Sequence, residues 1–433
     1  MTVAIIGGGY AGMAAAVTLA ARNIPVTVFE AAPTLGGRAR RVTVNETALD
    51  NGLHILIGAY SETLRLIEQV APGRDSFLRT PLDLNIHQRF RLSAPKLPAP
   101  LHVAWALLTA EGLDFDSKRA AARFINAMKA RQWRLEHDRS VEALLAEYTQ
   151  TIVLIKNLWA PLCVAALNTP LQRASAQVFL NVLRDSLGAG RAASDLLLAR
   201  SDLTQLFPKP AADYVRARGG SVECGATVDE VSADGQGFAL KVHGAPRNFD
   251  HVICAVAPHR ASPLLAGIPE LATAREQIEA LNYEPIHSVW LQFDGSVRLP
   301  SPMTGLADSP AHWLFDREVI CGQRGLIGAV ISASGDQVGE QQEALAQRIV
   351  ADIGKNFGTL PKLAWHRVIA EKRATFSCMP GLARPSCITA RKNFFLAGDY
   401  TAGEYPATIE AAVRSGIAAA QAIHGSTGSP RTI

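Results

Sequence analysis

The sequence near the start of the chain reads Gly7-Gly8-Gly9-Tyr10-Ala11-Gly12. An apolar run at residues 3–6 precedes this stretch, and an alanine-rich segment follows it to about residue 22. The apolar run predicts a strand, the alanine-rich segment predicts a helix, and residues 26–30 predict a second strand. Together these segments predict a βαβ unit in which the N-terminus of the helix faces a bound anion.

The glycines of this turn have separate roles in a dinucleotide-binding unit. Gly7 permits the tight turn, Gly9 lets the backbone approach a pyrophosphate, and Gly12 lets the helix pack closely on the sheet. Glu30 ends the second predicted strand 18 residues after Gly12, where its carboxylate can accept hydrogen bonds from a ribose diol. The pattern Gly-x-Gly-x-x-Gly alone is weak evidence, but strand, glycines, helix and acid in this order predict a dinucleotide site.

A second pair of glycines follows, in Leu35-Gly36-Gly37-Arg38-Ala39-Arg40. Two glycines allow the chain to run close over the dinucleotide, and the forked guanidinium of Arg38 can neutralise its diphosphate. A surface arginine that opens a strand is the alternative interpretation of Arg38. The order of Glu30, Gly37 and Arg38 resembles the FAD-containing amine oxidase and phytoene desaturase superfamily, and it departs from nicotinamide-dependent dehydrogenases.

The end of the chain carries a third motif, Asn393-Phe394-Phe395-Leu396-Ala397-Gly398-Asp399. It predicts a buried strand, and a helix is predicted from Pro406, with Gly425 as its C-terminal stop. The resemblance implies that Asp399 binds the ribityl or phosphate region of FAD and that the N-terminus of the helix points at the flavin. The resemblance implies further contacts with the cofactor from Leu53, Val228, Gly398 and Thr408.

The two halves of this FAD site lie at opposite ends of the chain, so the cofactor domain must be discontinuous. The expected fold class is α/β, with a Rossmann-like FAD-binding domain and a second, α+β substrate domain of the amine oxidase type. We assign residues 1–80, 206–280 and 386–433 to the FAD-binding domain. By elimination, residues 81–205, which are helical in character, and residues 281–385, which alternate apolar runs with turns, form the substrate and membrane-facing domain.

Longer motifs resemble one family within the superfamily, the hydroxysqualene dehydroxylases, also called squalene-associated FAD-dependent desaturases. The resemblance implies reductive chemistry in the synthesis of hopanoid precursors. In that reaction hydroxysqualene and reduced FAD give squalene, water and oxidised FAD, and hydride passes from flavin N5 to an allylic carbon of this long-chain isoprenoid. The motifs are residues 158–170, 174–179 and 371–376, Gly398-Asp399-Tyr400-Thr401, and Tyr405-Pro406-Ala407-Thr408.

Loss of an allylic hydroxyl requires a dry cavity and one acid. His54 lies in a loop that resembles the one beside the flavin ring, and imidazole titrates near neutral pH; the alternative is that His54 only positions the loop. Tyr405 directly precedes the predicted flavin-facing helix, where it either orients the hydroxyl or serves packing alone. Glu404 could be the acid only if burial raises its pKa; the alternative is that it is a solvated carboxylate without a catalytic role.

Three other functions are found in the same superfamily or fold. A carotenoid desaturase of the phytoene type acts oxidatively on a similar polyene, but residues 159–179 favour the dehydroxylase. An amine oxidase requires a polar, aromatic-lined cavity. Rab GDP-dissociation inhibitors bind prenyl lipids without flavin chemistry, and Glu30, Arg38 and Asp399 argue against that non-enzymatic alternative. The electron donor for FAD is not identified, because the chain has no second Gly-x-Gly-x-x-Gly segment.

The composition excludes several classes of protein. The chain has 433 residues, of which 48% are apolar and 19% charged, so it is neither disordered nor collagen-like. A net charge of +4 over this length does not indicate a nucleic-acid partner. The six cysteines lie at least nine residues apart and no two histidines fall within four positions, so no metal site is expected. Reduced thiols and the absence of a leader pattern predict a cytoplasmic protein.

Positive charge is concentrated in residues 79–139, which hold 11 Lys or Arg and 6 Asp or Glu. The longest apolar run, residues 97–110, is too short to span a bilayer. Basic and apolar residues then alternate at helical spacing, which is typical of a helix on an anionic bilayer, and we expect the protein on the inner face of the cell membrane. The alternative is an amphipathic helix packed on its own domain. We call these residues the basic stripe: Lys118, Arg119, Arg123, Phe124, Ile125, Met128, Lys129, Arg131, Trp133 and Arg134.

Overall fold

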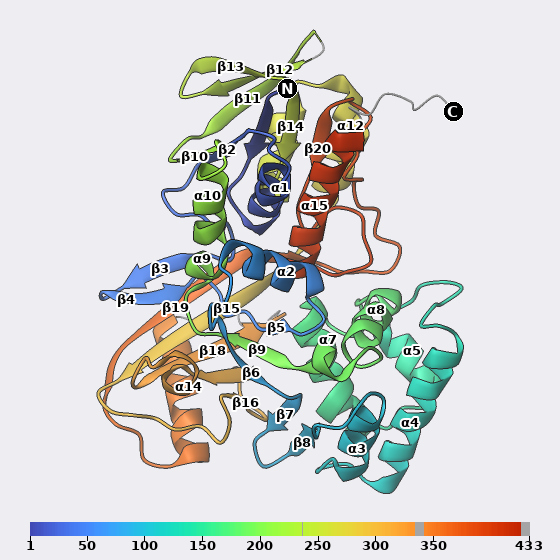
Figure 1. Cartoon of the computed structure of the whole chain (residues 1–433). Helices are drawn as coiled ribbons and strands as arrows, with labels where there is room; N and C mark the ends of the chain where they lie inside the picture. Colours follow the sequence, from blue (N-terminus) through green and yellow to red (C-terminus); the bar gives the residue numbers. More distant parts are fainter. Residues whose placement is uncertain (236, 334–341, 426–433) are drawn as a thin grey trace.

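A computed structural model describes residues 1–235, 237–333 and 342–425. At one end of the molecule five parallel strands form a sheet, and they come from the beginning, the middle and the end of the sequence (Figure 1). This arrangement confirms the predicted discontinuous, Rossmann-like domain. In spatial order the strands are β10 (Ser221–Cys224), β2 (Val26–Glu30), β1 (Val3–Ile6), β14 (His251–Cys254) and β20 (Phe394–Leu396).

Helices cover this sheet, so its central strands are buried and appear in the sequence as continuous apolar runs. Helix α1 (Tyr10–Ala20) packs between α15 (Ile409–Gly425) and α10 (Pro208–Arg216). A Cβ on Gly416 of α15 would lie 2.1 Å from the carbonyl oxygen of Ala11, which is why the two helices can approach so closely. An antiparallel ribbon adjoins this region and consists of β11 (Val228–Asp234), β12 (Gly237–Val242) and β13 (Ala245–Phe249).

A second sheet of seven strands lies below the first in the view of Figure 1. Its strands are antiparallel except for one parallel pair, β16 with β7. Helix α14 (Gln342–Phe357) buries its apolar side against β15 and β18. The spatial order is β19 (Leu363–Phe376), β15 (Tyr283–Phe293), β18 (Leu326–Ser332), β17 (Trp313–Asp316), β16 (Met303–Gly305), β7 (Asp83–Ile86) and β8 (Phe90–Ser93).

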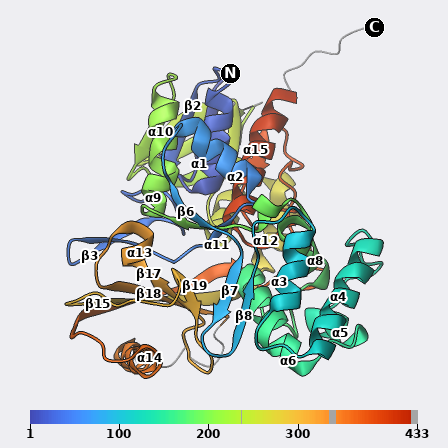
Figure 2. The same cartoon turned by 60° about the horizontal axis from the view of Figure 1, so that its bottom comes forward.

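A group of helices lies beside the seven-stranded sheet (Figure 2). Side chains of Asp114, Ser140, Thr151 and Ser175 cap the N-termini of four of these helices. Their core is built around Trp159, whose ring contacts Phe124 and Phe179 edge to face. The helices are α3 (Leu101–Thr109), α4 (Phe115–Ala130), α5 (Val141–Glu147), α6 (Ile152–Leu154) with a π-helical extension (Ile155–Trp159), α7 (Ala160–Leu167) and α8 (Ala176–Ser186).

Smaller elements join the two regions. Strand β9 pairs with both β5 and β6, so a strand from residues 81–205 bonds to strands from residues 1–80. The exact domain boundaries stay a prediction, and the part of it beyond residue 425 lies outside the described residues. The remaining elements are β3 (Arg41–Val44), β4 (Thr47–Asp50), β5 (Leu56–Ile57), α2 (Ser61–Val70), β6 (Phe77–Thr80), β9 (Leu196–Ala199), α9 (Leu203–Leu206), α11 (Pro258–Leu265), α12 (Ala272–Glu279) and α13 (Arg317–Cys321).

The basic stripe does not offer its apolar side to solvent. Phe124 and Met128 are fully buried, and Trp133 is 7% exposed, in the core of the helical group. The structure therefore shows the alternative, an amphipathic helix packed on its own domain, for this segment. Within the described residues, no helix is long and apolar enough to cross a membrane.

Candidate active site

The glycine turn between β1 and α1 combines two tight contacts with one open position. A Cβ on Gly12 would lie 1.9 Å from the carbonyl oxygen of Gly7, and a Cβ on Gly7 would lie 2.7 Å from that of Ala255 in the neighbouring segment. A Cβ on Gly9, in contrast, would meet nothing closer than 3.8 Å, the distance to Cα of Gly37. Gly7 and Gly12 therefore serve packing, whereas a Cβ on Gly9 would make only ordinary van der Waals contact with the second glycine loop.

Gly9 lies at the N-terminus of α1. Gly9 is the N-cap residue, no side chain caps the helix, and its first turn carries no acid. The unpaired N–H groups and the helix dipole make such a terminus a binding site for an anion. The second glycine loop lies over the turn, because Gly36 N donates to the Gly8 carbonyl at 2.9 Å. The cradle therefore fits the diphosphate of a dinucleotide.

Glu30 lies at the carboxyl end of β2, beside the glycine turn. Its carboxylate accepts hydrogen bonds from Gly8 N at 2.7 Å and from Ala32 N at 2.8 Å. The Glu30 carbonyl accepts from Ala226 N at 2.9 Å, which brings the start of β11 and the buried Val228 to this edge of the sheet. Glu30 and Val228 therefore lie at the same edge of the sheet, and their contacts with the cofactor stay predictions.

Arg38 and Asp399 come together although they are 361 residues apart. Arg38 Nη2 lies 2.5 Å from Asp399 Oδ1, and Arg38 Nη1 donates to the carbonyl of Ala374 at 2.7 Å. Burial alone would lower the pKa of Arg38, but the charge of Asp399 outweighs it, so the pKa is raised and the guanidinium stays charged. Gly398, with a φ of +157°, follows the end of β20 by two residues and directly precedes Asp399.

The loop after β4 brings Leu53 and His54 between the two sheets. The carboxylate of Asp50, which is 4% exposed, accepts from Leu203 N at 2.7 Å, and burial raises its pKa to about 7. Leu53 N donates to Ser288 Oγ at 3.3 Å, and the Leu53 side chain packs against Trp290. His54 Nδ1 lies 2.9 Å from the Gly52 carbonyl, and burial lowers the pKa of the imidazole.

A large apolar cavity lies between the helical group and the seven-stranded sheet, with a volume of about 1410 Å³ that includes space open to solvent. Leucine, isoleucine, valine and aromatic side chains form most of its wall, from α3, α4, α7, α8 and the sheet. Its polar groups lie on α8, beside β9, and where the FAD-binding region meets the cavity. Among the described lining residues the polar ones are Tyr60, Asp185, Ser186, Ser194, Tyr405 and Thr408.

Tyr405 and Asp185 form a hydrogen-bonded pair in this wall. Tyr405 Oη donates to Asp185 Oδ2 at 2.6 Å, and Arg184 donates to both carboxylate oxygens of Asp185, from Nε at 2.7 Å and from Nη2 at 3.0 Å. Burial and the hydrogen bond to Asp185 raise the pKa of Tyr405 to about 12. Burial opposes ionisation of Asp185, but the hydrogen bonds from Arg184 and Tyr405 outweigh it and lower its pKa.

Glu404 does not belong to the cavity wall. Its side chain is 45% exposed and pairs with Arg134 at 2.7 Å and with Arg184 at 3.0 Å. The hydrogen bond from Arg184 lowers the pKa of Glu404, which is the reverse of the raised pKa that a proton donor would need. His54 also lies outside the lining, although Ile55 is part of it. The structure therefore brings only Tyr405, of the three acid candidates, to the cavity.

Asp185 is the residue that the sequence interpretation missed. It follows the family-like residues 174–179 on α8, and a signal was present in the helical spacing. Phe179, Val182 and Ser186 are separated by three and four positions and line the cavity together with Asp185. A carboxylate on an apolar helix face is unusual and marks a candidate functional group.

The helix at the end of the chain starts later than the proline signal predicts. Helix α15 begins at Ile409 rather than Pro406, and Thr408 Oγ1 accepts from Ala411 N at 3.1 Å, so a threonine near the N-terminus satisfies one of the free N–H groups. Glu410, fully buried in the first turn, accepts from the N–H groups of Glu62 and Thr63 at the start of α2. Tyr405, Pro406 and Thr408 consequently face the cavity just ahead of the helix.

These features define a flavoprotein oxidoreductase. The chain matches the family of flavin containing amine oxidoreductases over residues 10–424 and belongs to it, and FAD is its cofactor. The fold agrees, because cyclohexylamine oxidase from Brevibacterium oxydans superposes with a TM-score of 0.71 at 18% identity, over 98% of this chain and 99% of that chain. The predicted cofactor and fold class are thereby confirmed.

Among curated proteins, the chain is similar to hydroxysqualene dehydroxylases. It is 30% identical to the one from Rhodopseudomonas palustris, over 98% of both chains. It is 28% identical to the one from Zymomonas mobilis, over 96% of this chain and 97% of that protein. A zeta-carotene desaturase from Synechocystis is 25% identical, over 98% of this chain and 97% of that protein. The predicted resemblance is confirmed, and the roles of single site residues stay predictions.

Proposed function

We propose that the protein is a hydroxysqualene dehydroxylase that uses reduced FAD to convert hydroxysqualene to squalene and water. The observation that carries this proposal is the cavity: a large apolar space whose wall holds the Tyr405–Asp185 pair. A C30 isoprenoid with one hydroxyl group has the matching chemistry, since its chain is apolar and its single polar group needs one partner. The similarity to two dehydroxylases over their full length supports it.

The chain would hold FAD with the groups already described. The N-terminus of α1 at Gly9 suits the diphosphate, Glu30 the ribose, and the Arg38–Asp399 pair the region between diphosphate and flavin. Reduced FAD, as FADH2, would supply both the hydride that replaces the hydroxyl group and the proton with which that group leaves as water. The remaining work of the protein is to orient the alcohol and to keep water away from it.

Tyr405 orients the alcohol in this proposal. Because its proton is directed at Asp185, the lone pairs of Tyr405 Oη are free to accept a hydrogen bond from the substrate hydroxyl. Arg184 keeps Asp185 ionised and fixed, so the tyrosine has one preferred hydroxyl orientation. The alcohol would then bind at one defined depth in an otherwise apolar cavity, because burial of its hydroxyl group without a hydrogen bond would cost free energy.

His54 and Glu404 have supporting roles in the proposal. The lowered pKa of His54 leaves its imidazole neutral at neutral pH, so we assign it the positioning of the loop that carries Leu53. Glu404 holds Arg184 from the solvent side and thereby helps to fix Asp185. Neither residue is assigned the transfer of a proton.

A carotenoid desaturase is the second candidate, favoured by the similarity to zeta-carotene desaturase and by the apolar cavity. A hydrocarbon substrate would leave Tyr405 and Asp185 without a polar partner from the ligand. The pair therefore favours an alcohol over a polyene.

Anaerobic turnover tests the two candidates. FAD-loaded protein is reduced with dithionite, mixed with hydroxysqualene, and extracted for gas chromatography with mass detection. We expect one squalene per reduced flavin and the return of the absorbance of oxidised FAD. Protein with oxidised FAD is incubated with zeta-carotene in parallel. Desaturation of the carotene, with no squalene from the alcohol, would overturn the proposal in favour of the second candidate.

A further inference from the structure

Helix α3 is apolar on every side, although half of it faces solvent. Its nine residues, Leu-His-Val-Ala-Trp-Ala-Leu-Leu-Thr, include no charged side chain. Ala106 and Leu107 are buried, but Leu101 is 55%, Trp105 51% and Leu108 64% exposed. Helices that are apolar all round are normally enclosed by protein or by lipid. The outer face of α3 therefore lacks the cover of protein or lipid that an apolar helix face normally has.

Two neighbouring helix ends extend this face. Lys118 Nζ of α4 donates to the Leu108 carbonyl at 2.8 Å, and Ser117 Oγ lies 2.5 Å from Thr151 Oγ1, the N-cap of α6. These contacts gather the exposed side chains of three helices, which we call the apolar cap. Its members are Leu101, Trp105, Leu108, Phe115, Ile152 and Val153, six of the nine large apolar side chains that are exposed in the described chain.

The apolar cap lies at the end of the molecule remote from the five-stranded sheet (Figures 1 and 2). It is also next to the cavity, because the inner side of α3 contributes Val103 and Leu107 to the cavity wall. One short helix thus separates the cavity from an exposed apolar surface. Single exposed leucines need no explanation, but a contiguous group beside an apolar cavity marks an interaction site.

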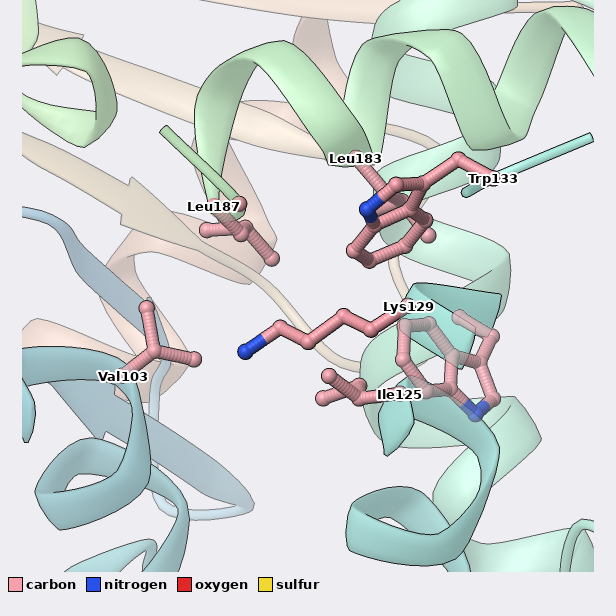
Figure 3. Close-up of a pocket in the computed structure, with 8 residues that line it drawn as sticks. Val103, Ile125, Lys129, Trp133, Leu183 and Leu187 are labelled. Atoms are coloured by element: carbon pink, nitrogen blue, oxygen red, sulfur yellow. The ribbon is translucent and has the colours of Figure 1, made fainter. Parts of the chain in front are cut away.

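A smaller opening adjoins the cavity between α3, α4 and α8, with a volume of about 290 Å³ that includes space open to solvent. It shares Val103, Ile125, Leu183 and Leu187 with the cavity wall. Figure 3 shows the amino group of Lys129 reaching into the gap between Val103 and Leu187. An apolar passage with a cation at its rim suits the boundary between lipid tails and phosphate headgroups.

Cations outnumber acids around the apolar cap. Four cations border it: Lys96 precedes α3, Lys118 contacts the last turn of α3, and Arg119 and Lys156 follow Phe115 and Ile152 within about one helical turn. Of the nearby acids, Asp114 is engaged as the N-cap of α4, while Glu111 and Asp116 are exposed. A net positive rim around an apolar surface complements an anionic bilayer.

We propose that the apolar cap inserts into the headgroup region of an anionic bilayer, and that the opening beside Lys129 admits a long-chain isoprenoid from the lipid. Only the identity of this isoprenoid rests on the proposed function. The surface differs from the basic stripe, whose apolar side is buried, and it is formed by the apolar run at residues 97–110 and two helix ends.

Vesicle binding tests the insertion without any need for turnover. FAD-loaded full-length protein is sedimented with vesicles of mixed phosphatidylcholine and phosphatidylglycerol. Leu108→Glu and Trp105→Glu are each expected to weaken binding about tenfold or more, because a charge replaces an inserted apolar group. Ile388→Glu is the matched control, since Ile388 is 63% exposed outside the apolar cap, and its binding should equal that of the wild type.

Two further measurements locate the surface. With brominated lipids, tryptophan emission should be quenched in the wild type, and Trp105→Phe should bind normally but lose that quenching. Lys129→Gln should weaken binding to anionic vesicles about fivefold, whereas Lys209→Gln, a replacement of an exposed lysine on α10, should not. Equal binding of Leu108→Glu and Ile388→Glu, or a change of oligomeric state in the apolar-cap variants, would overturn the inference.

Turnover in two media separates this inference from the proposed function. Apolar-cap variants should match the wild type when hydroxysqualene is dissolved in detergent micelles and should be slower when it is supplied in vesicles. Equal rates of wild type and Leu108→Glu on vesicles would overturn the entry route. If the wild type forms no squalene in either medium, the proposed function is wrong. The vesicle-binding results would still show whether the apolar cap inserts into the membrane.

Discussion

Replacement of Asp50 by asparagine should change how stability depends on pH. Asp50 is 4% exposed, and burial raises its pKa from the ordinary 3.8 to about 7. Between these two values the folded protein keeps the proton and the unfolded chain loses it. The free energy of unfolding of the wild type therefore falls as pH rises from about 4 to about 7, and is constant with respect to Asp50 above that range.

The size of the effect follows from the pKa difference. Between pH 5 and pH 8 the Asp50 contribution amounts to about 3 kcal/mol, at ~1.4 kcal/mol for each pH unit below the folded pKa. An asparagine side chain at this position would still accept the hydrogen bond from Leu203 N but would not titrate. The stability of Asp50→Asn relative to the wild type should thus rise by about 3 kcal/mol from pH 5 to pH 8, whatever its offset at pH 5.

Urea unfolding at several pH values measures this difference. Asp294→Asn, the same substitution at an exposed aspartate, serves as the control for the exchange of a carboxylate for an amide. A constant difference between Asp50→Asn and the wild type from pH 5 to pH 8 would refute the reasoning. It would mean that Asp50 ionises in the folded protein near its ordinary pKa.

Three further substitutions test the site and the fold. Gly9→Ala should fold normally, because the new Cβ would lie no closer than 3.8 Å to another protein atom. It should nevertheless weaken FAD binding about tenfold or more, because the methyl group fills space that the diphosphate needs. Gly12→Ala, in contrast, should fail to fold, because its Cβ would lie 1.9 Å from the Gly7 carbonyl oxygen. Unchanged FAD affinity of Gly9→Ala in a titration would contradict this placement of the cofactor. Tyr405→Phe should lower kcat/KM for hydroxysqualene about tenfold to a hundredfold and leave the affinity for FAD unchanged. Tyr214→Phe is the control and should behave as the wild type. A Tyr405→Phe enzyme with wild-type activity would show that the alcohol binds elsewhere. Glu410→Gln should destabilise the protein by about 3 kcal/mol, because the buried carboxylate that accepts hydrogen bonds from α2 and from Arg414 is replaced by a neutral amide. An unchanged midpoint of thermal unfolding would exclude a stabilising role for the Glu410 carboxylate.

The sequence was sufficient for the FAD-binding region because its signals are local. A strand, a glycine turn and a helix within residues 3–22 determine the first unit, and Arg38 and Asp399 each follow a recognisable motif. The predicted start of the last helix, Pro406, was three residues too early. A proline is suited to several positions near the start of a helix, and Thr408 supplies the cap directly before Ile409.

The cavity was not predictable in the same way. Asp185 reaches it because α8 packs against residues near the end of the chain, and no local pattern encodes that contact. The basic stripe shows the related difficulty that an amphipathic pattern does not tell what covers its apolar side. Phe124 and Met128 of α4 are covered by protein, whereas the run that contains Trp105 keeps an exposed face.

The ion pair between Arg38 and Asp399 has a consequence for the life of the protein in the cell. Asp399 is synthesised 361 residues after Arg38, and β20 must pair with β14 before Asp399 can reach Arg38. Since chains begin to fold from the N-terminus during synthesis, a ribosome-bound chain that still lacks β20 has an incomplete site. We therefore expect tight retention of FAD only in chains that extend through β20, where Asp399 can meet Arg38.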